Sequence, residues 1–196
     1  MINIILLGAP GSGKGTQAEK IIQRYNLVHL STGDIFREEI KKGSAIGILA
    51  KSYIDKGELI PDSVVLKELY RRALLHKNAK GLIFDGFPRN EKQGAMLDLL
   101  LRKKKKPISI VVCLEVPEEE LFVRILKRAQ ISGRTDDTEE VIKNRLRIYR
   151  SETEPLKEYY KKQHKLIEVN GNRDVLNVAH SVSTSIDEFI ENKNLK

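Results

Sequence analysis

The amino-acid sequence predicts an α/β protein built on a doubly wound, five-stranded parallel sheet. Two observations carry this prediction: short apolar runs alternate with longer segments of helical periodicity, and several of the runs are apolar on both faces. Strands with two apolar faces are typical of a parallel sheet that helices cover on both sides. Alternation of strands and helices along the chain is typical of doubly wound folds. The expected strands are 2–7, 27–30, 81–85, 109–115 and 165–170.

The first expected strand runs directly into the glycine-rich stretch GAPGSGKGT, residues 8–16, which opens a helix. In this context the stretch predicts a loop whose backbone N–H groups wrap an anion at a helix N-terminus. Lys14 adds a charge that can follow a phosphoryl group, and this favours phosphate binding over an ordinary glycine-rich turn. The usual form of such a loop has Ser or Thr directly after the lysine. Here Gly15 follows, and the hydroxyl comes one residue later, on Thr16.

Two stretches interrupt the alternation of strands and helices. From Thr32 to about His76, three helical patterns follow one another without a strand, which predicts an inserted helical subdomain. The polar, glycine-containing stretch that begins at 130 separates two helices and predicts a loop or a small flap. The expected boundaries are 31–60 for the insert, 130–138 for the flap or short lid, and 1–30, 61–129 and 139–196 for the core.

The stretch DGFPR, residues 85–89, follows the third expected strand, at the carboxyl edge where open α/β sheets bind ligands. At this position Asp85 can order the water shell of Mg²⁺, although a turn acid is the alternative. Arg89 is well placed to bind a phosphate through its forked guanidinium. Gln93 lies four residues further on, and its amide offers a donor and an acceptor that match the edge of adenine.

Helical periodicity places several arginines on faces that are expected to be buried. Arg124 and Arg128 are four residues apart and share one face of a helix. Arg145 falls within the apolar arc of the next helix, whereas Lys143 and Arg147 face away. An arginine on a burying face needs an anionic partner, which is either an acidic side chain or a bound phosphate.

Taken in order, GAPGSGKGT, STGDIFR, DGFPR and RILKRAQISGRTDD resemble the nucleoside monophosphate kinases, above all the adenylate kinase family. The resemblance covers essentially the whole chain. It implies a fold of the P-loop kinase type with a helical monophosphate-binding insert and a lid of the short type, both closing over the substrates. The implied reaction is reversible, direct in-line transfer of a phosphoryl group from MgATP to AMP, giving two ADP.

The resemblance also assigns roles to individual residues. In that family glycine is the normal residue after the lysine, and Mg²⁺ is held mostly by nucleotide phosphates and waters, with Thr16 and Asp85 nearby. The implied catalytic residues are Lys14, Arg89, Arg124, Arg128, Arg134 and Arg145. The implied ATP-binding residues are Gly11, Ser12, Gly13, Lys14, Gly15, Thr16, Arg124, Arg128 and Arg173. The implied AMP-binding residues are Thr32, Arg37, Glu58, Leu59, Ile60, Gly86, Phe87, Pro88, Arg89, Gln93, Arg134 and Arg145.

Two other functions compete with this interpretation. A UMP/CMP kinase of the same family typically has Ala at the position of Thr32 and Asn at that of Gln93, so this sequence favours AMP. A nucleotide-dependent nucleic-acid-binding protein is suggested by the net charge of +8 and by the lysine run 103–106. That run ends a helix, where positive charges interact favourably with the helix dipole. We therefore interpret these lysines as a solvated helix terminus. Thr32 can also be a simple helix-cap residue, and Arg37 can also be a solvated residue on the surface of its helix.

Composition narrows the class of protein further. The only cysteine, Cys113, lies in an apolar run, which predicts a buried small side chain and no cysteine-clustered zinc site. No apolar run approaches the ~18 residues needed to span a bilayer, and the amino terminus lacks a basic leader. We expect a cytoplasmic monomer that acts on ATP, AMP and ADP, with Mg²⁺ but without zinc, nucleic acid or a membrane.

Overall fold

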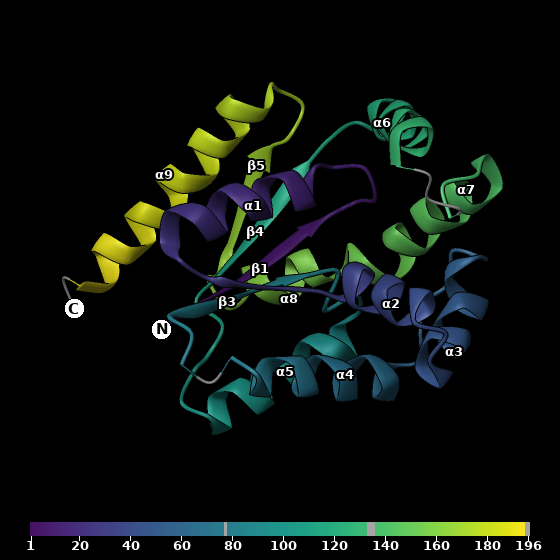
Figure 1. Cartoon of the computed structure of the whole chain (residues 1–196). Helices are drawn as coiled ribbons and strands as arrows, with labels where there is room; N and C mark the ends of the chain where they lie inside the picture. Colours follow the sequence, from purple (N-terminus) through teal and green to yellow (C-terminus); the bar gives the residue numbers. More distant parts are fainter. Residues whose placement is uncertain (77, 133–135, 195–196) are drawn as a thin grey trace.

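The computed structural model describes residues 1–76, 78–132 and 136–194. Its centre is a five-stranded sheet in the order β2-β3-β1-β4-β5, and every neighbouring pair is parallel (Figure 1). This confirms the predicted doubly wound α/β class. The strands are β1 (Ile2–Gly8), β2 (Val28–Ser31), β3 (Gly81–Asp85), β4 (Ile110–Glu115) and β5 (Leu166–Asn170).

Helices connect the strands and cover both faces of the sheet. They are α1 (Lys14–Tyr25), α2 (Thr32–Lys41), α3 (Ala45–Ile54), α4 (Asp62–Leu74), α5 (Glu91–Lys103), α6 (Glu118–Ser132), α7 (Glu139–Ile148), the π-helical turn η1 (Tyr149–Thr153), α8 (Leu156–Lys161) and α9 (Val175–Asn194). In Figure 1, α6 and α7 lie beyond the carboxyl ends of the strands, on the same side as α2 and α3. The carboxyl edge of the sheet is therefore surrounded by helices.

The core consists of two main apolar clusters, one on each face of the sheet. Successive residues of β1 alternate between them: Ile4 and Leu6 pack with α1 and α9, whereas Ile5 and Leu7 pack with residues of α2, α4, α5 and α8. This alternation follows from the period of two in a strand. It explains why the strands read as continuous apolar runs, because both faces are buried.

Side-chain caps begin several of the helices. In each case a side-chain oxygen accepts a hydrogen bond from the backbone N–H three residues later, which satisfies a donor that the first turn leaves unpaired. These caps are Ser31 for α2, Ser44 for α3, Asn90 for α5 and Thr138 for α7. The chain leaves α1 through Asn26, whose left-handed φ of 52° ends the helix, and pairs with β3 only from Val28 onward. Strand β2 consequently lies one residue later than expected.

The expected start of the lid, at residue 130, can be compared with the described residues. Helix α6 continues to Ser132, so residues 130–132 of the expected lid are helical. Residues 133–135, including Arg134, lie outside the described residues. Within the insert, Ile35, Phe36 and Ala50 belong to the same apolar cluster as the sheet. Over the described ranges, no helix combines the length and apolar character that crossing a membrane requires.

Candidate functional site

A cavity of about 860 Å³ opens at the carboxyl edge of the sheet. Its lining combines the glycine loop with residues from the ends of β3 and β5 and from α6 and α7. These segments are far apart in the sequence, and the parallel strands bring them together because all their carboxyl ends meet at one edge. The cavity is therefore at the place where doubly wound folds bind ligands.

The glycine loop needs its glycines for two different reasons. Gly8, Gly11 and Gly13 have φ values of 139°, 84° and 92°, a region that side chains disfavour. Gly11 also packs so closely on α6 that an added Cβ would lie 2.9 Å from the carbonyl oxygen of Leu121. Gly15 is different, because a Cβ there would meet no atom within 4 Å. The protein does not require glycine at 15 for its own packing.

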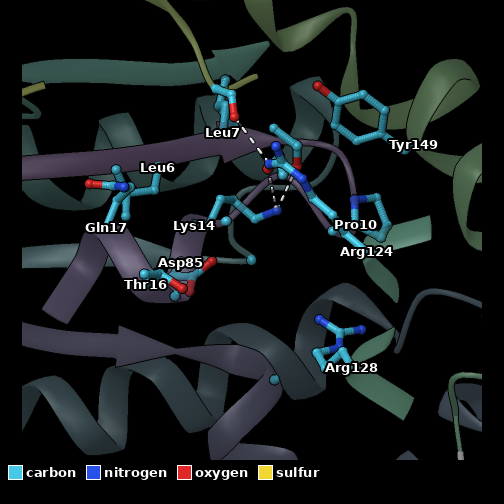
Figure 2. Close-up of a pocket in the computed structure, with 18 of the residues that line it drawn as sticks. Leu6, Leu7, Pro10, Lys14, Thr16, Gln17, Asp85, Arg124, Arg128 and Tyr149 are labelled. Atoms are coloured by element: carbon cyan, nitrogen blue, oxygen red, sulfur yellow. Dashed lines mark hydrogen bonds between the residues drawn. The ribbon is translucent and has the colours of Figure 1, made fainter. Parts of the chain in front are cut away.

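Lys14 is the first residue of α1, and its side chain turns back over the loop. Its Nζ donates hydrogen bonds to the carbonyl oxygens of Gly8 and Ala9, at 2.7 and 2.9 Å (Figure 2). The pKa of Lys14 is lowered to about 8, mainly by burial, with a contribution from the positive charges of Arg89 and Arg145 and against the opposing effect of Asp85. A lysine with this environment is a cation that the protein alone stabilises poorly.

Asp85 ends β3 and lines the same cavity as Thr16. Burial disfavours its charged form, but His29 and the charge of Lys14 outweigh burial and hold the pKa of Asp85 below its usual value. Nε2 of His29 lies 3.4 Å from the carboxylate. Asp85 is thus an ionised carboxylate beside an exposed threonine hydroxyl. These are hard oxygen ligands of the kind that Mg²⁺ prefers.

Two of the predicted arginines meet on an acidic pair. Arg128 donates to both oxygens of Asp137, at 2.8 and 2.7 Å, while Arg145 Nη1 donates to Asp137 at 2.8 Å and to Asp136 at 3.0 Å. Both arginines also line the larger cavity. Arg145 is inward, as its helical position predicts, with 17% of its side chain exposed, whereas Lys143 is 67% exposed. The acidic partner that the sequence left open as an alternative is therefore present.

Arg124, on α6, also lines the larger cavity. Its Nε donates to Glu120 at 2.7 Å, and its Nη1 donates to the carbonyl oxygen of Gly171 at 3.0 Å. These contacts tie α6 to the loop after β5, and Arg173 from that loop lines the same cavity. The structure thus brings Arg124 and Arg173 together, although 49 positions separate them in the sequence.

A smaller cavity of about 70 Å³ adjoins the larger one between the insert and the DGFPR stretch. Most of the expected acceptor residues line it, namely Thr32, Arg37, Glu58, Leu59, Ile60, Gly86, Arg89, Gln93 and Arg145. Arg37, Arg89 and Arg145 line both cavities. The two cavities therefore share a boundary that includes these three arginines.

Several of these residues already have partners within the protein. The hydroxyl of Thr32 donates to the carbonyl oxygen of Gly86 at 2.9 Å, and Arg37 pairs with Asp34 at 2.7 Å. Arg89 Nε donates to the same Gly86 carbonyl at 2.8 Å. Burial lowers the pKa of Arg89 to about 10, and the charge of Arg145 contributes. Of these contacts, the hydrogen bond from Thr32 to Gly86 joins the insert to the DGFPR stretch, whereas the other two lie within one segment.

Other expected acceptor residues are placed differently. The side chain of Phe87 is 1% exposed and packs in the apolar core, and it lines neither of the two cavities. Pro88 lines the larger cavity rather than the smaller one. Arg134 lies outside the described residues.

Sequence reasoning missed two side chains that contact site residues. His29 on β2 lies beside Asp85, and Asp62 at the start of α4 accepts a hydrogen bond from the amide of Gln93. Both contacts join segments more than 30 residues apart, and a single sequence carries no signal that pairs them. In the described part of the chain, no three His, Cys, Asp or Glu side chains form a group that could hold a metal ion.

The larger cavity has the features of a nucleotide-phosphate site, and comparisons with known proteins agree. The family model described as adenylate kinase matches residues 6–165. An adenylate kinase of Bacteroides fragilis is 46% identical, over 95% of this chain and 99% of that protein. One of Phocaeicola vulgatus is 48% identical over 87% and 90%, and one of Methanosarcina barkeri is 38% identical over 96% and 100%. The chain therefore belongs to the adenylate kinase family.

Proposed function

We propose that this chain is an adenylate kinase, which transfers the γ-phosphoryl group of ATP reversibly to AMP and yields two ADP. The observation that supports this most is the convergence of Lys14, Arg89 and Arg145 on one cavity. The charges of the two arginines lower the pKa of Lys14, and that of Arg145 lowers the pKa of Arg89. Mutual repulsion of buried cations suits a ligand that brings many negative charges.

On the donor side, the backbone N–H groups of residues 11–16 would cradle the ATP phosphates at the N-terminus of α1. Lys14 would exchange its loop carbonyls for phosphate oxygens, which also restores the partner that its buried charge needs. The contacts of Arg124 with Glu120 and Gly171 would hold its guanidinium at the side of the donor base. Arg173 borders the same region.

On the acceptor side, the smaller cavity would receive the base of AMP and the arginines at its boundary would hold the monophosphate. A guanidinium carries five N–H donors, so Arg37, Arg89 and Arg145 can keep their present contacts and still bind phosphate oxygens. Thr32 and Gln93 would contact the adenine. The resemblance adds Arg134 and Arg128 to the residues that bind the transferring group.

Transfer would proceed in one step. An oxygen of the AMP phosphate forms a bond to the γ-phosphorus of ATP, and the bond from that phosphorus to the β–γ bridging oxygen breaks, so that ADP leaves with the electron pair. Proteins assist such transfers by positioning and by stabilising charge. Lys14 and the arginines would do both, and enclosure by the insert and lid would keep water from the γ-phosphoryl group.

Asp85 and Thr16 would be the protein groups closest to Mg²⁺. Two oxygen donors on one wall suit an ion that takes one or two protein ligands and fills its remaining positions with phosphates and water. When bound, the ion supplies charge neutralisation of the phosphates. We further propose that the protein acts in the cytoplasm as a monomer.

The two competing functions receive less support. A UMP/CMP kinase would need a pyrimidine-selective pocket, whereas Thr32 and Gln93, the pair that favours AMP, both line the smaller cavity. A nucleic-acid-binding function would rest on the lysine run 103–106, which lies at the end of α5. The relatives from Bacteroides fragilis and Methanosarcina barkeri, both named adenylate kinase, match this chain over nearly their full length.

A coupled assay of ADP formation with ATP and Mg²⁺ tests the proposal, with AMP, CMP and UMP as acceptors in separate reactions. AMP should give the highest kcat/KM, and Lys14→Met should lower it by about 10²-fold or more, as for other groups that stabilise transition-state charge. Lys143→Met is the matched control, because that exposed lysine pairs only with Glu139 among the contacts described. Faster transfer to CMP or UMP would favour the pyrimidine kinase. Salt-sensitive binding of DNA without transfer to AMP would favour the nucleic-acid alternative.

A further inference from the structure

The side-chain amide of Gln93 is held from two sides. Its Oε1 accepts a hydrogen bond from the backbone N–H of Arg89 at 2.7 Å, and its Nε2 donates to Oδ1 of Asp62 at 2.7 Å. Gln93 is 2% exposed, so water offers little replacement for either contact. The amide is thus clamped between a donor and a carboxylate.

These two contacts determine on which side of the Gln93 amide the oxygen lies and on which side the nitrogen lies. If the amide were rotated by 180°, Nε2 would face the N–H of Arg89 and Oε1 would face the carboxylate of Asp62. Both contacts would then be repulsive, and a buried donor and acceptor would lose their partners. The hydrogen bond to a charged group is the stronger of the two. Asp62 therefore contributes more than the backbone N–H to the fixed orientation.

The fixed amide presents a defined pattern to the smaller cavity, which Gln93 lines. An amide nitrogen has two hydrogens and the oxygen two lone pairs, so each atom can make one further hydrogen bond. A base with a ring nitrogen that accepts and an amino group that donates, as on the Watson–Crick edge of adenine, complements this pattern. A base with a ring N–H beside a carbonyl oxygen, as in hypoxanthine, meets donor with donor and acceptor with acceptor.

We propose that Asp62 is a specificity-determining residue, which sets the orientation of the Gln93 amide and so makes the acceptor site reject bases of the hypoxanthine type. Asp62 lines neither of the two cavities, and it acts through Gln93 as a positioning residue. The inference rests on the proposed function, because it needs the acceptor base to occupy the smaller cavity.

The test compares kcat/KM for AMP and for IMP in three variants. Asp62→Ala removes the carboxylate, and the ratio of AMP to IMP should fall by about tenfold or more, the value of one hydrogen bond to a charged group. Asp62→Asn keeps the shape of the side chain, but its amide can turn either an oxygen or an NH₂ group to Gln93 and so pairs with both orientations, and the ratio should fall as in Asp62→Ala. Lys92→Ala removes the exposed cation 3.9 Å from Asp62 and should leave the ratio unchanged.

The ratio is measured on one sample of each variant, so it does not depend on the fraction of protein that is folded. An unchanged ratio in Asp62→Ala would overturn the inference while leaving the kinase function intact. A ratio in Asp62→Asn as high as in the original protein would also overturn it, because an acceptor-only carboxylate at position 62 would then not be what fixes the orientation of the Gln93 amide. Absence of transfer to AMP in the original protein would overturn the proposed function itself.

Discussion

Asp137 is the centre of the charge cluster that joins α6 to α7. Its side chain is 0% exposed, and among the described contacts it accepts two hydrogen bonds from Arg128 and one from Arg145, at 2.7–2.8 Å. Asp137→Asn keeps the shape of the side chain but removes its charge and replaces one accepting oxygen with a donating NH₂. That group would face a guanidinium N–H, and two arginines would lose their shared counter-charge.

The size of the effect follows from burial. Removing one partner of a fully buried ion pair costs about 3–5 kcal/mol, because the other charge is left without a partner. Here the side chains of Arg128 and Arg145 are 30% and 17% exposed, and Asp136 stays 3.0 Å from Arg145. Water and Asp136 therefore compensate in part, and we expect a loss of about 2–3 kcal/mol. For a chain of this length, each kcal/mol lowers Tm by about 2–4 °C.

Thermal unfolding followed by circular dichroism measures this prediction, with an expected fall in Tm of about 5–10 °C. Glu139→Gln is the matched control, because it also neutralises a carboxylate in an ion pair of 2.7 Å near the start of α7. That pair is exposed, and its loss should leave Tm close to that of the original protein. If Asp137→Asn melted together with Glu139→Gln, the cluster would not stabilise the fold and the reasoning from burial would be refuted.

Three further predictions concern the glycines and Lys14. Because burial lowers the pKa of Lys14 to about 8 from 10.5, the unfolded chain binds this proton more tightly, and the contribution of Lys14 to stability should rise between these two pH values. Over the same pH range kcat/KM for ATP should fall, because Lys14 loses its charge. In Lys14→Arg, kcat/KM should not change with pH, and a fall in both proteins would show that another group titrates. Gly15→Ala should leave Tm unchanged, since its Cβ meets no atom within 4 Å; a fall of several degrees would contradict this. Gly86→Ala should lower Tm and raise KM for AMP, because φ is 74° and the Cβ would lie 2.6 Å from Oγ1 of Thr32; a normal KM would show that the turn does not shape the acceptor site.

Some features of the site could be predicted because they are local. The glycine loop, the strand before it and the helix after it are contiguous, so one stretch of sequence describes the whole strand–loop–helix unit. The inward position of Arg145 and the outward position of Lys143 follow from the period of the helix alone. The acidic pair that receives Arg145 lies only eight and nine residues away.

Other features could not be predicted in the same way. Phe87 stands within the DGFPR stretch, yet its side chain packs in the core, because the turn directs it toward the apolar cluster rather than the cavities. The lid boundary could not be placed from pattern alone, since the polar, glycine-containing stretch that begins at 130 starts with residues that continue α6 to Ser132. Polarity indicates exposure, and an exposed helix and a loop look alike by that measure.

The sequence by itself determined the class of fold, the glycine loop between strand and helix, and the faces on which the arginines lie, because these depend on periodicity and on neighbours within a few residues. Only the tertiary structure decided which distant residues meet. The strand order places His29 beside Asp85, and the position of α4 next to α5 brings Asp62 to Gln93 across 31 residues. The physical reason is that an amphipathic pattern specifies which side of an element is buried, whereas the partner on that side is chosen by the packing of the whole chain.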